Sequence, residues 1–125
     1  MLLKLILETS QLDAHQIVAG TVIAAHASFD YVKTSTGFVG HGAKIEHVKL
    51  MVAATKVLGD KGVGRRMKVK ASGGIRTLKD AVDMIEVGAS RLGTSGGVWI
   101  VKEGKDSVSG EVKRPGMTTR LFTDY

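Results

Sequence analysis

The sequence contains no cysteine among its 125 residues, which excludes disulfide bonds and thiolate metal ligands. It has one proline, and aromatic residues make up only 5% of the chain. No apolar run approaches the roughly 20 residues that a membrane-spanning helix needs. The opening MLLKLIL is interrupted by Lys4 and lacks a small-residue cleavage site, which argues against a signal peptide. We therefore expect a cytoplasmic protein without a membrane partner.

The net charge of +6 raises the question of a nucleic-acid partner. The densest basic stretch, KGVGRRMKVK at residues 61–70, has no aromatic residue on which a base could stack. Its last part alternates apolar and basic residues, as a strand entering a core does. An anionic small molecule therefore explains the charge better than DNA or RNA. The four histidines do not pair with carboxylates at a ligand spacing, so no metal site is predicted.

Short apolar runs alternate with amphipathic segments along the chain. We expect strands at 3–8, 29–33, 67–71 and 90–94, and helices at 12–27, 44–58, 78–87 and from 96 onward. Ser10 with Asp13, and Thr77 with Asp80, have the spacing of helix capping boxes. This alternation predicts an α/β fold with parallel strands, either a doubly wound sheet or part of a (β/α)₈ barrel. Because a full barrel needs roughly 250 residues, the chain has room for about half of one.

The polarity of the chain changes near its end. Residues 1–103 carry the alternating pattern and are expected to form one domain. Residues 104–125 are polar, contain the only proline and are expected to be a loosely ordered tail.

Two lysines end strands that we expect to be neighbours. Lys33 ends DYVK and is followed by the hydroxyl residues 34–36, and Lys70 ends MKVK. Neighbouring parallel strands lie about 4.8 Å apart and present ligand sites at their carboxyl ends, so both ammonium groups can enter one pocket. Like charge and burial disfavour protonation, so a lysine placed there can form a Schiff base with a carbonyl. Thr36 and its neighbours would orient the amine or bind a substrate hydroxyl. The sequence fits equally well with lysines that extend into solvent.

Two consecutive loops between strand and helix are rich in glycine. SGGIR and GTSGG each precede a helix, and backbone amides at such positions can approach an anion closely. One glycine pair could be only a tight turn, but two in consecutive loops favour a phosphate site. The candidate residues are Gly73, Gly74, Arg76, Gly93 and Gly96. A lysine nucleophile beside a phosphate site predicts a class I aldolase that acts on a phosphorylated sugar.

The segments KLILETSQL, DYVKTSTGF, VKASGGIRT and SRLGTSGG occur in the order and spacing of deoxyribose-phosphate aldolase. The sequence resembles this family from about Leu3 to Glu103. The resemblance implies that Lys33 forms the Schiff base and that Lys70 tunes it. It implies cleavage of 2-deoxy-D-ribose 5-phosphate to D-glyceraldehyde 3-phosphate and acetaldehyde, in deoxyribonucleotide catabolism, without a metal or organic cofactor. Around the phosphate it would place Gly37, Gly73, Gly74, Arg76, Gly93 and Ser95.

Members of this family are complete (β/α)₈ barrels, so the sequence resembles their strands five to eight, a half-barrel of about four β/α units. The proton-relaying aspartate of the family lies on one of the other strands. Phe38 stands where many members carry a lysine, and Tyr125 matches a final tyrosine of some members on a tail that does not match. A truncated or split gene, an incomplete gene model, and a half-barrel that dimerises all fit.

The expected partner of a half-barrel is a second copy or the missing N-terminal half, because two strand edges would otherwise be unpaired. The alternative function is a non-catalytic phosphate-binding or assembly subunit.

Overall fold

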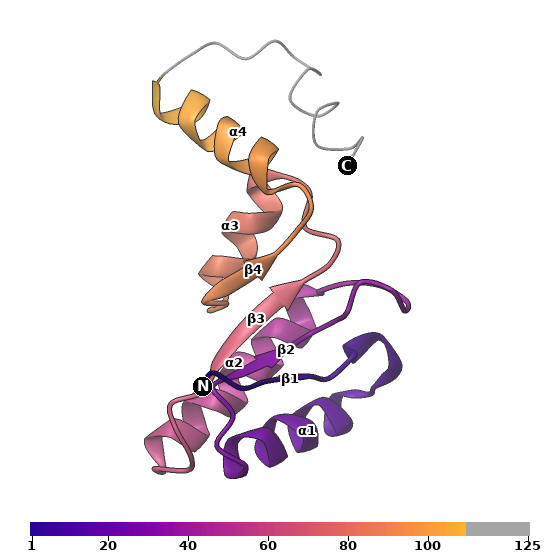
Figure 1. Cartoon of the computed structure of the whole chain (residues 1–125), viewed down its shortest axis with the longest axis vertical. Coiled ribbons are helices and arrows are strands. Elements are labelled where there is room, and N and C mark those ends of the chain that lie inside the picture. The colour runs from indigo at the N-terminus through magenta and orange to yellow at the C-terminus, as the bar shows by residue number, and fades with distance from the viewer. Residues whose placement is uncertain (110–125) are drawn as a thin grey trace.

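The computed structural model describes residues 1–109, which form a sheet of four strands with helices on one side (Figure 1). The strands are β1 (Lys4–Ile6), β2 (Tyr31–Lys33), β3 (Lys68–Ser72) and β4 (Arg91–Gly93). The helices are the 3₁₀ turn η1 (Thr9–Gln11), α1 (Ala14–His26), α2 (Ile45–Asp60), α3 (Leu78–Glu86) and α4 (Gly97–Ser109). The strand order is β1-β2-β3-β4, and every neighbouring pair is parallel. The predicted parallel α/β fold is therefore confirmed.

The start of α1 differs from the prediction. Asp13 caps the helix: its carboxylate accepts a hydrogen bond from the Gln16 amide at 2.8 Å, and the Gln16 side chain accepts one from the Asp13 amide at 3.0 Å. The Ser10 hydroxyl instead donates to the carbonyl of Val39 at 3.0 Å. The 3₁₀ turn η1 separates β1 from α1, and Glu8 before it has a left-handed φ of 57°. The capping box predicted at Ser10 was therefore wrong.

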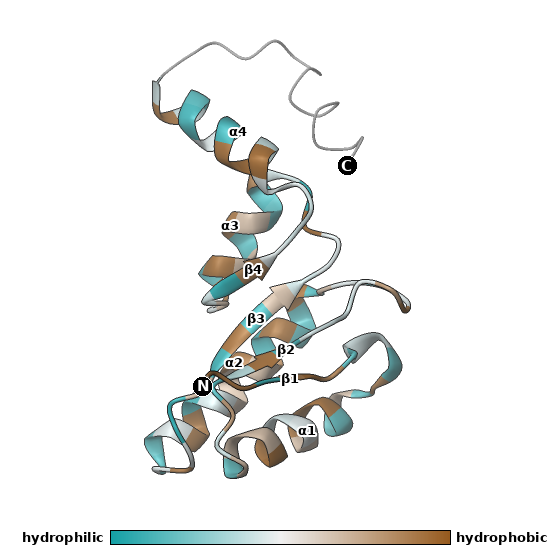
Figure 2. Cartoon of the chain, viewed as in Figure 1, coloured by the Kyte–Doolittle hydropathy of each residue, from teal (hydrophilic) through white to brown (hydrophobic). Residues whose placement is uncertain are grey.

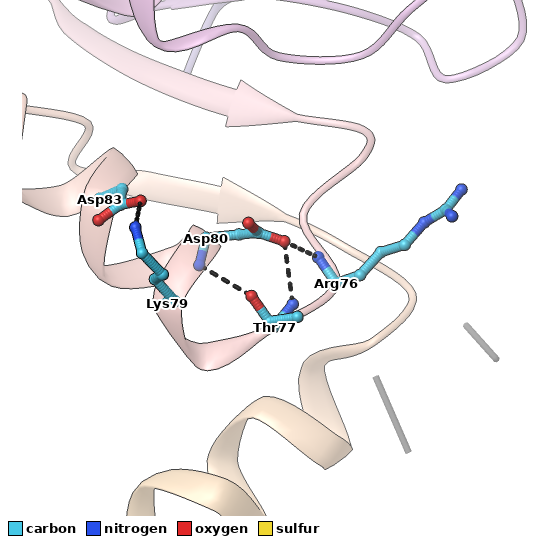
Figure 3. Close-up of polar contacts among 5 residues, drawn as sticks. All are labelled: Arg76, Thr77, Lys79, Asp80 and Asp83. Atoms are coloured by element: carbon cyan, nitrogen blue, oxygen red, sulfur yellow. Dashed lines mark hydrogen bonds and ion pairs between the residues drawn. The ribbon is translucent and has the colours of Figure 1, made fainter. Parts of the chain in front are cut away.

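The capping box predicted at the start of α3 is confirmed. The Thr77 hydroxyl accepts a hydrogen bond from the Asp80 amide at 3.0 Å, and the Asp80 carboxylate accepts one from the Thr77 amide at 3.2 Å (Figure 3). The helix ends at Glu86, and Gly88 beyond it has φ 110°. A Cβ atom at Gly88 would lie 2.6 Å from Cγ1 of Val52, so both conformation and space require glycine at this stop.

The hydrophobic core lies between the sheet and the helices. The strand residues Val32, Val69 and Ala71 are at most 2% exposed and belong to one cluster with Ile17 of α1 and Met51 of α2. Brown, hydrophobic segments alternate with teal, hydrophilic ones along β3 (Figure 2), as expected for a strand with one face in the core. Burial of this apolar surface drives the docking of the helices onto the sheet.

The opposite face of the sheet is basic. Side chains alternate along a strand, so the neighbours of the core residues point away from the helices. In the parallel register Tyr31 lies beside Lys4 and Lys68, and Lys70 lies between Lys33 and Arg91. The guanidinium of Arg91 lies 4.4 Å from the centre of the Tyr31 ring. No helix covers this face in residues 1–109.

The predicted tail begins too early. Residues 104–109 are the last part of α4 and are helical, because Ile100 is buried and the Glu103 carboxylate accepts a hydrogen bond from the Leu78 amide at 3.0 Å. The rest of the predicted tail, with Tyr125, lies outside the described residues. Within residues 1–109, none of the helices has the length and apolar character that a bilayer-spanning segment requires.

Replacing Thr77 with alanine is expected to lower the free energy of unfolding by about 1 kcal/mol, because the Asp80 amide loses its acceptor. Thr77→Ser retains the capping hydroxyl and is expected to retain most of the stability. Urea unfolding followed by circular dichroism measures both variants. Equal destabilisation by alanine and serine would contradict a capping role.

Candidate active site

Lys33 and Lys70 face each other across two neighbouring strands. They are direct partners in the register of β2 and β3, and both side chains are half-buried on the basic face. Burial lowers the pKa of the Lys70 ammonium below its usual value, and the charges of Lys4 and Lys33 act in the same direction. The structure thus places the lowered pKa on the lysine to which the resemblance gave the tuning role. The two lysines share one environment and do not extend into separate regions of solvent.

Lys4 is a third member of this cluster, and the sequence analysis did not select it. Its positive charge is the second cause, after burial, of the lowered pKa of Lys70. The sequence could have identified Lys4 from the alternation of side chains along β1. Lys4 and Ile6 are two residues apart and so lie on the same face, and Ile6 pairs with Lys33. All three side chains therefore leave the sheet on the same face.

The hydroxyl residues after Lys33 have different environments. Thr34 is fully buried and joins two strands: its hydroxyl donates to the Ser72 carbonyl at 3.1 Å and accepts from the Ser72 amide at 3.0 Å. Ser35 is also fully buried, and its hydroxyl has no partner in the described part of the chain. Thr36 alone of the three lines the pocket described next. Thr34 therefore holds the strands together and does not orient a substrate.

A pocket of about 400 Å³ lies beyond the carboxyl ends of the strands. Three loops line it, through Thr36, Gly37, Ser72, Gly73, Gly74, Ile75, Arg76, Gly93, Thr94 and Ser95. The structure thus brings together all the binding residues selected from the sequence except Gly96. The Gly96 amide donates to the Thr94 hydroxyl at 2.9 Å, and the Thr94 hydroxyl donates to the Ile75 carbonyl.

Two glycines allow close approach of neighbouring groups beside this pocket. A Cβ atom at Gly42 would lie 2.3 Å from the backbone of Gly73, and the neighbouring Ala43 amide bonds the carbonyls of both Ser72 and Gly73 at 3.0 Å. A Cβ atom at Gly93 would lie 2.2 Å from the Ser72 hydroxyl and 3.0 Å from Cε of Lys70. A larger residue at Gly93 would thus fill the space between the pocket and the lysine cluster.

The first amides of α3 are already used by carboxylates. The Arg76 and Thr77 amides donate to Asp80 at 3.1 and 3.2 Å (Figure 3), and the Leu78 amide donates to Glu103 at 3.0 Å. These amides are therefore not available to a phosphate, in contrast to the expectation for a helix start.

Several donor groups at the pocket remain unused within the described residues. The amides of Gly74 and Ser95 make no hydrogen bond to the described residues. The guanidinium of Arg76 also has no partner there, and it extends away from Asp80 and α3 (Figure 3). Two amides and one guanidinium on neighbouring loops are a donor set suited to a phosphate group.

The lowered pKa of Lys70 predicts a specific dependence of stability on pH. Above the folded-state pKa the folded chain has released this proton while the unfolded chain still binds it, so stability rises with pH up to the ordinary lysine pKa of 10.5. Lys70→Met is expected to remove this rise and to increase the melting temperature at pH 7 by roughly a few degrees. Thermal unfolding from pH 7 to 10.5 measures it. The exposed Lys56→Met is the control and should retain the rise; retention by Lys70→Met would contradict the interpretation.

Four parallel strands with helices on one face and a pocket at their carboxyl ends are the arrangement of part of a (β/α) barrel. No family model matches the sequence. A deoxyribose-phosphate aldolase of Coccidioides immitis is 56% identical over 102 residues, which are 82% of this chain and 36% of that protein. One from Caldicellulosiruptor saccharolyticus is 53% identical over 102 residues, 82% of this chain and 43% of that protein.

The fold is similar to a solved structure as well. The tetrameric deoxyribose phosphate aldolase of Aeropyrum pernix matches with a TM-score of 0.73 and 35% identity, covering 85% of this chain and 42% of that one. The chain is therefore a homologue of the deoxyribose-phosphate aldolases. It spans about two fifths of the length of the relatives that it matches.

Proposed function

We propose that the chain carries the Schiff-base site of a class I aldolase that cleaves 2-deoxy-D-ribose 5-phosphate to D-glyceraldehyde 3-phosphate and acetaldehyde. The observation that carries this proposal is the register pairing of Lys33 with Lys70, whose pKa is lowered and whose Cε would lie 3.0 Å from a Cβ atom at the pocket residue Gly93. A second amine close to the nucleophile favours loss of a proton from the pair, and only a neutral amine attacks a carbonyl.

In this proposal the Lys33 amine attacks the aldehyde carbon C1, and loss of water gives an iminium ion. The C3 hydroxyl then releases its proton, the C2–C3 bond breaks, and its electron pair moves towards the iminium nitrogen to form an enamine. D-glyceraldehyde 3-phosphate leaves, C2 is protonated, and water releases acetaldehyde from Lys33. Lys70 is suited to accept and return protons in these steps, because its pKa is lowered towards the working range.

The phosphate of the substrate is assigned to the other end of the pocket. The free amides of Gly74 and Ser95 and the guanidinium of Arg76 would bind its oxygens. Gly93 leaves room for the sugar between this end and Lys70. Remote binding of a phosphate holds the aldehyde at the nucleophile and so supplies part of the catalytic advantage.

The second candidate is a non-catalytic phosphate-binding or assembly subunit. The basic face of the sheet and the edges of β1 and β4, which pair with no other strand in residues 1–109, favour association with a further set of strands. That partner would be a second copy or an N-terminal half of the barrel. In this case the pocket would still bind phosphate esters, but Lys33 would form no adduct.

Borohydride reduction in the presence of acetaldehyde separates the two candidates. We expect a covalent two-carbon adduct on Lys33 of the 125-residue chain, located by peptide mass spectrometry. Lys33→Leu should abolish the adduct, and Lys49→Leu, at an exposed position of α2, should leave it unchanged. Phosphate-ester binding without any adduct would support the non-catalytic subunit.

Arg76→Gln tests the phosphate end of the pocket. Loss of a charge-assisted hydrogen bond is expected to weaken the binding of a phosphate ester about tenfold or more. The matched control is Arg65→Gln, which removes an arginine that lies 3.5 Å from Asp30 and outside the pocket. Equal affinities of the two variants, measured by calorimetry, would refute the assignment.

A further inference from the structure

Glu8 reaches the pocket from a neighbouring loop, and neither the sequence analysis nor the proposed reaction gives it a role. It follows β1, and its backbone has a φ of 57°, in the left-handed region that residues other than glycine rarely adopt. Its carboxylate accepts hydrogen bonds from Thr36, which is 28 residues away: from the amide at 3.2 Å and from the hydroxyl at 2.5 Å. Thr36 lines the pocket, so Glu8 fixes a pocket residue through two contacts.

The hydrogen bonds of the Thr36 hydroxyl can be counted. A hydroxyl has one proton to donate and two lone pairs to accept, and an ionised carboxylate can only accept. The proton is used by Glu8, and one lone pair accepts the Phe38 amide at 3.2 Å. One lone pair is left, so Thr36 can accept a hydrogen bond from a ligand but has no proton to donate to one.

The loops that line the pocket therefore differ in what they offer a ligand. Gly74, Arg76 and Ser95, on the loops after β3 and β4, offer hydrogen-bond donors, whereas the Thr36 hydroxyl, on the loop after β2, can only accept. Phosphate oxygens only accept, so they fit the donors and are disfavoured beside the Thr36 hydroxyl and the carboxylate of Glu8. A substrate hydroxyl, which carries a proton, fits the Thr36 hydroxyl.

We propose that Glu8 is a positioning residue that makes Thr36 a hydrogen-bond acceptor, so that Thr36 selects a substrate hydroxyl and not the phosphate. This inference rests on the proposed function only in taking a phosphorylated, hydroxylated ligand for the pocket. The sequence left open whether Thr36 orients the amine or binds a substrate hydroxyl, and this inference selects the hydroxyl.

Glu8→Gln is the informative variant because it keeps the size of the side chain and both contacts. The glutamine oxygen can accept the Thr36 amide, while its NH₂ group donates to the Thr36 hydroxyl and frees the hydroxyl proton. A role limited to holding the loop would survive this change, but acceptor polarity would not.

The probes are glycerol 3-phosphate and n-propyl phosphate, which differ only in their hydroxyl groups. By calorimetry with the full 125-residue chain, we expect the wild type to bind glycerol 3-phosphate about tenfold more tightly. In Glu8→Gln the freed Thr36 proton can be donated to a phosphate oxygen, so n-propyl phosphate should bind about threefold more tightly and the preference for glycerol 3-phosphate should fall to about threefold or less. Glu86→Gln, on the exposed end of α3, is the control and should retain the full preference.

Variants of Thr36 complete the test. Thr36→Val should lose the preference as Glu8→Gln does, Thr36→Ser should retain it, and the double variant Glu8→Gln, Thr36→Val should lose nothing further, because both act on one interaction. An unchanged preference in Glu8→Gln, an equal weakening of both esters, or a wild type without preference would overturn the inference. Circular dichroism spectra of the variants should match the wild type; an unfolded Glu8→Gln chain would show a structural role instead.

The inference and the proposed function fail in different ways. Neither ester contains a carbonyl group, so neither can form an imine with Lys33. Loss of borohydride trapping with a retained glycerol 3-phosphate preference would refute the aldolase chemistry alone. A wild type that binds neither ester would refute the polarity of the pocket, and the lysine chemistry would still be testable with acetaldehyde.

Discussion

The register between β2 and β3 is the constraint on which the site depends. The buried hydroxyl of Thr34 exchanges two hydrogen bonds with the backbone of Ser72, so a slip by one residue would break both and would turn the lysines towards the core. In the observed register Lys33 and Lys70 are paired, and the loops after them reach the same pocket. The helices hold the strands through the opposite, apolar face, which leaves the basic face open for chemistry.

Repulsion among the cations on the basic face of the sheet destabilises the folded chain. Lys4, Lys33 and Lys70 lie close enough to affect one pKa, and Arg91 contributes to the same shift. Like charges on a partly buried surface destabilise the folded chain, and perturbed titration of this kind is typical of functional sites. A second copy docked face to face would double the number of these cations, so it would need anionic ligands or counterions between the two sheets.

The spacing of apolar and polar residues along the chain predicted the sheet and the helices. The paired lysines followed from the order of the strands, because residues at the ends of neighbouring parallel strands lie side by side. The cap at Thr77 could also be predicted, since both partners lie within one turn. The cap at Ser10 could not, because Val39 from a distant loop competes for its hydroxyl. The occupied amide of Leu78 also depends on a long-range partner, Glu103, and the extent of α4 depends on packing rather than on its polar sequence. Lys4 was available from the alternation of β1 but was not considered with the other strand-end lysines.

The bond between Glu103 and Leu78 has a consequence for how this part of the molecule opens. Because a side chain in the middle of α4 closes the first turn of α3, fraying of α4 exposes an amide that lies two residues from Arg76. The two helices should then protect their amides as one cooperative unit in hydrogen exchange, with Arg76 at its border. Motion of α4 would thus be transmitted through Glu103 and Leu78 to the loop that carries Arg76.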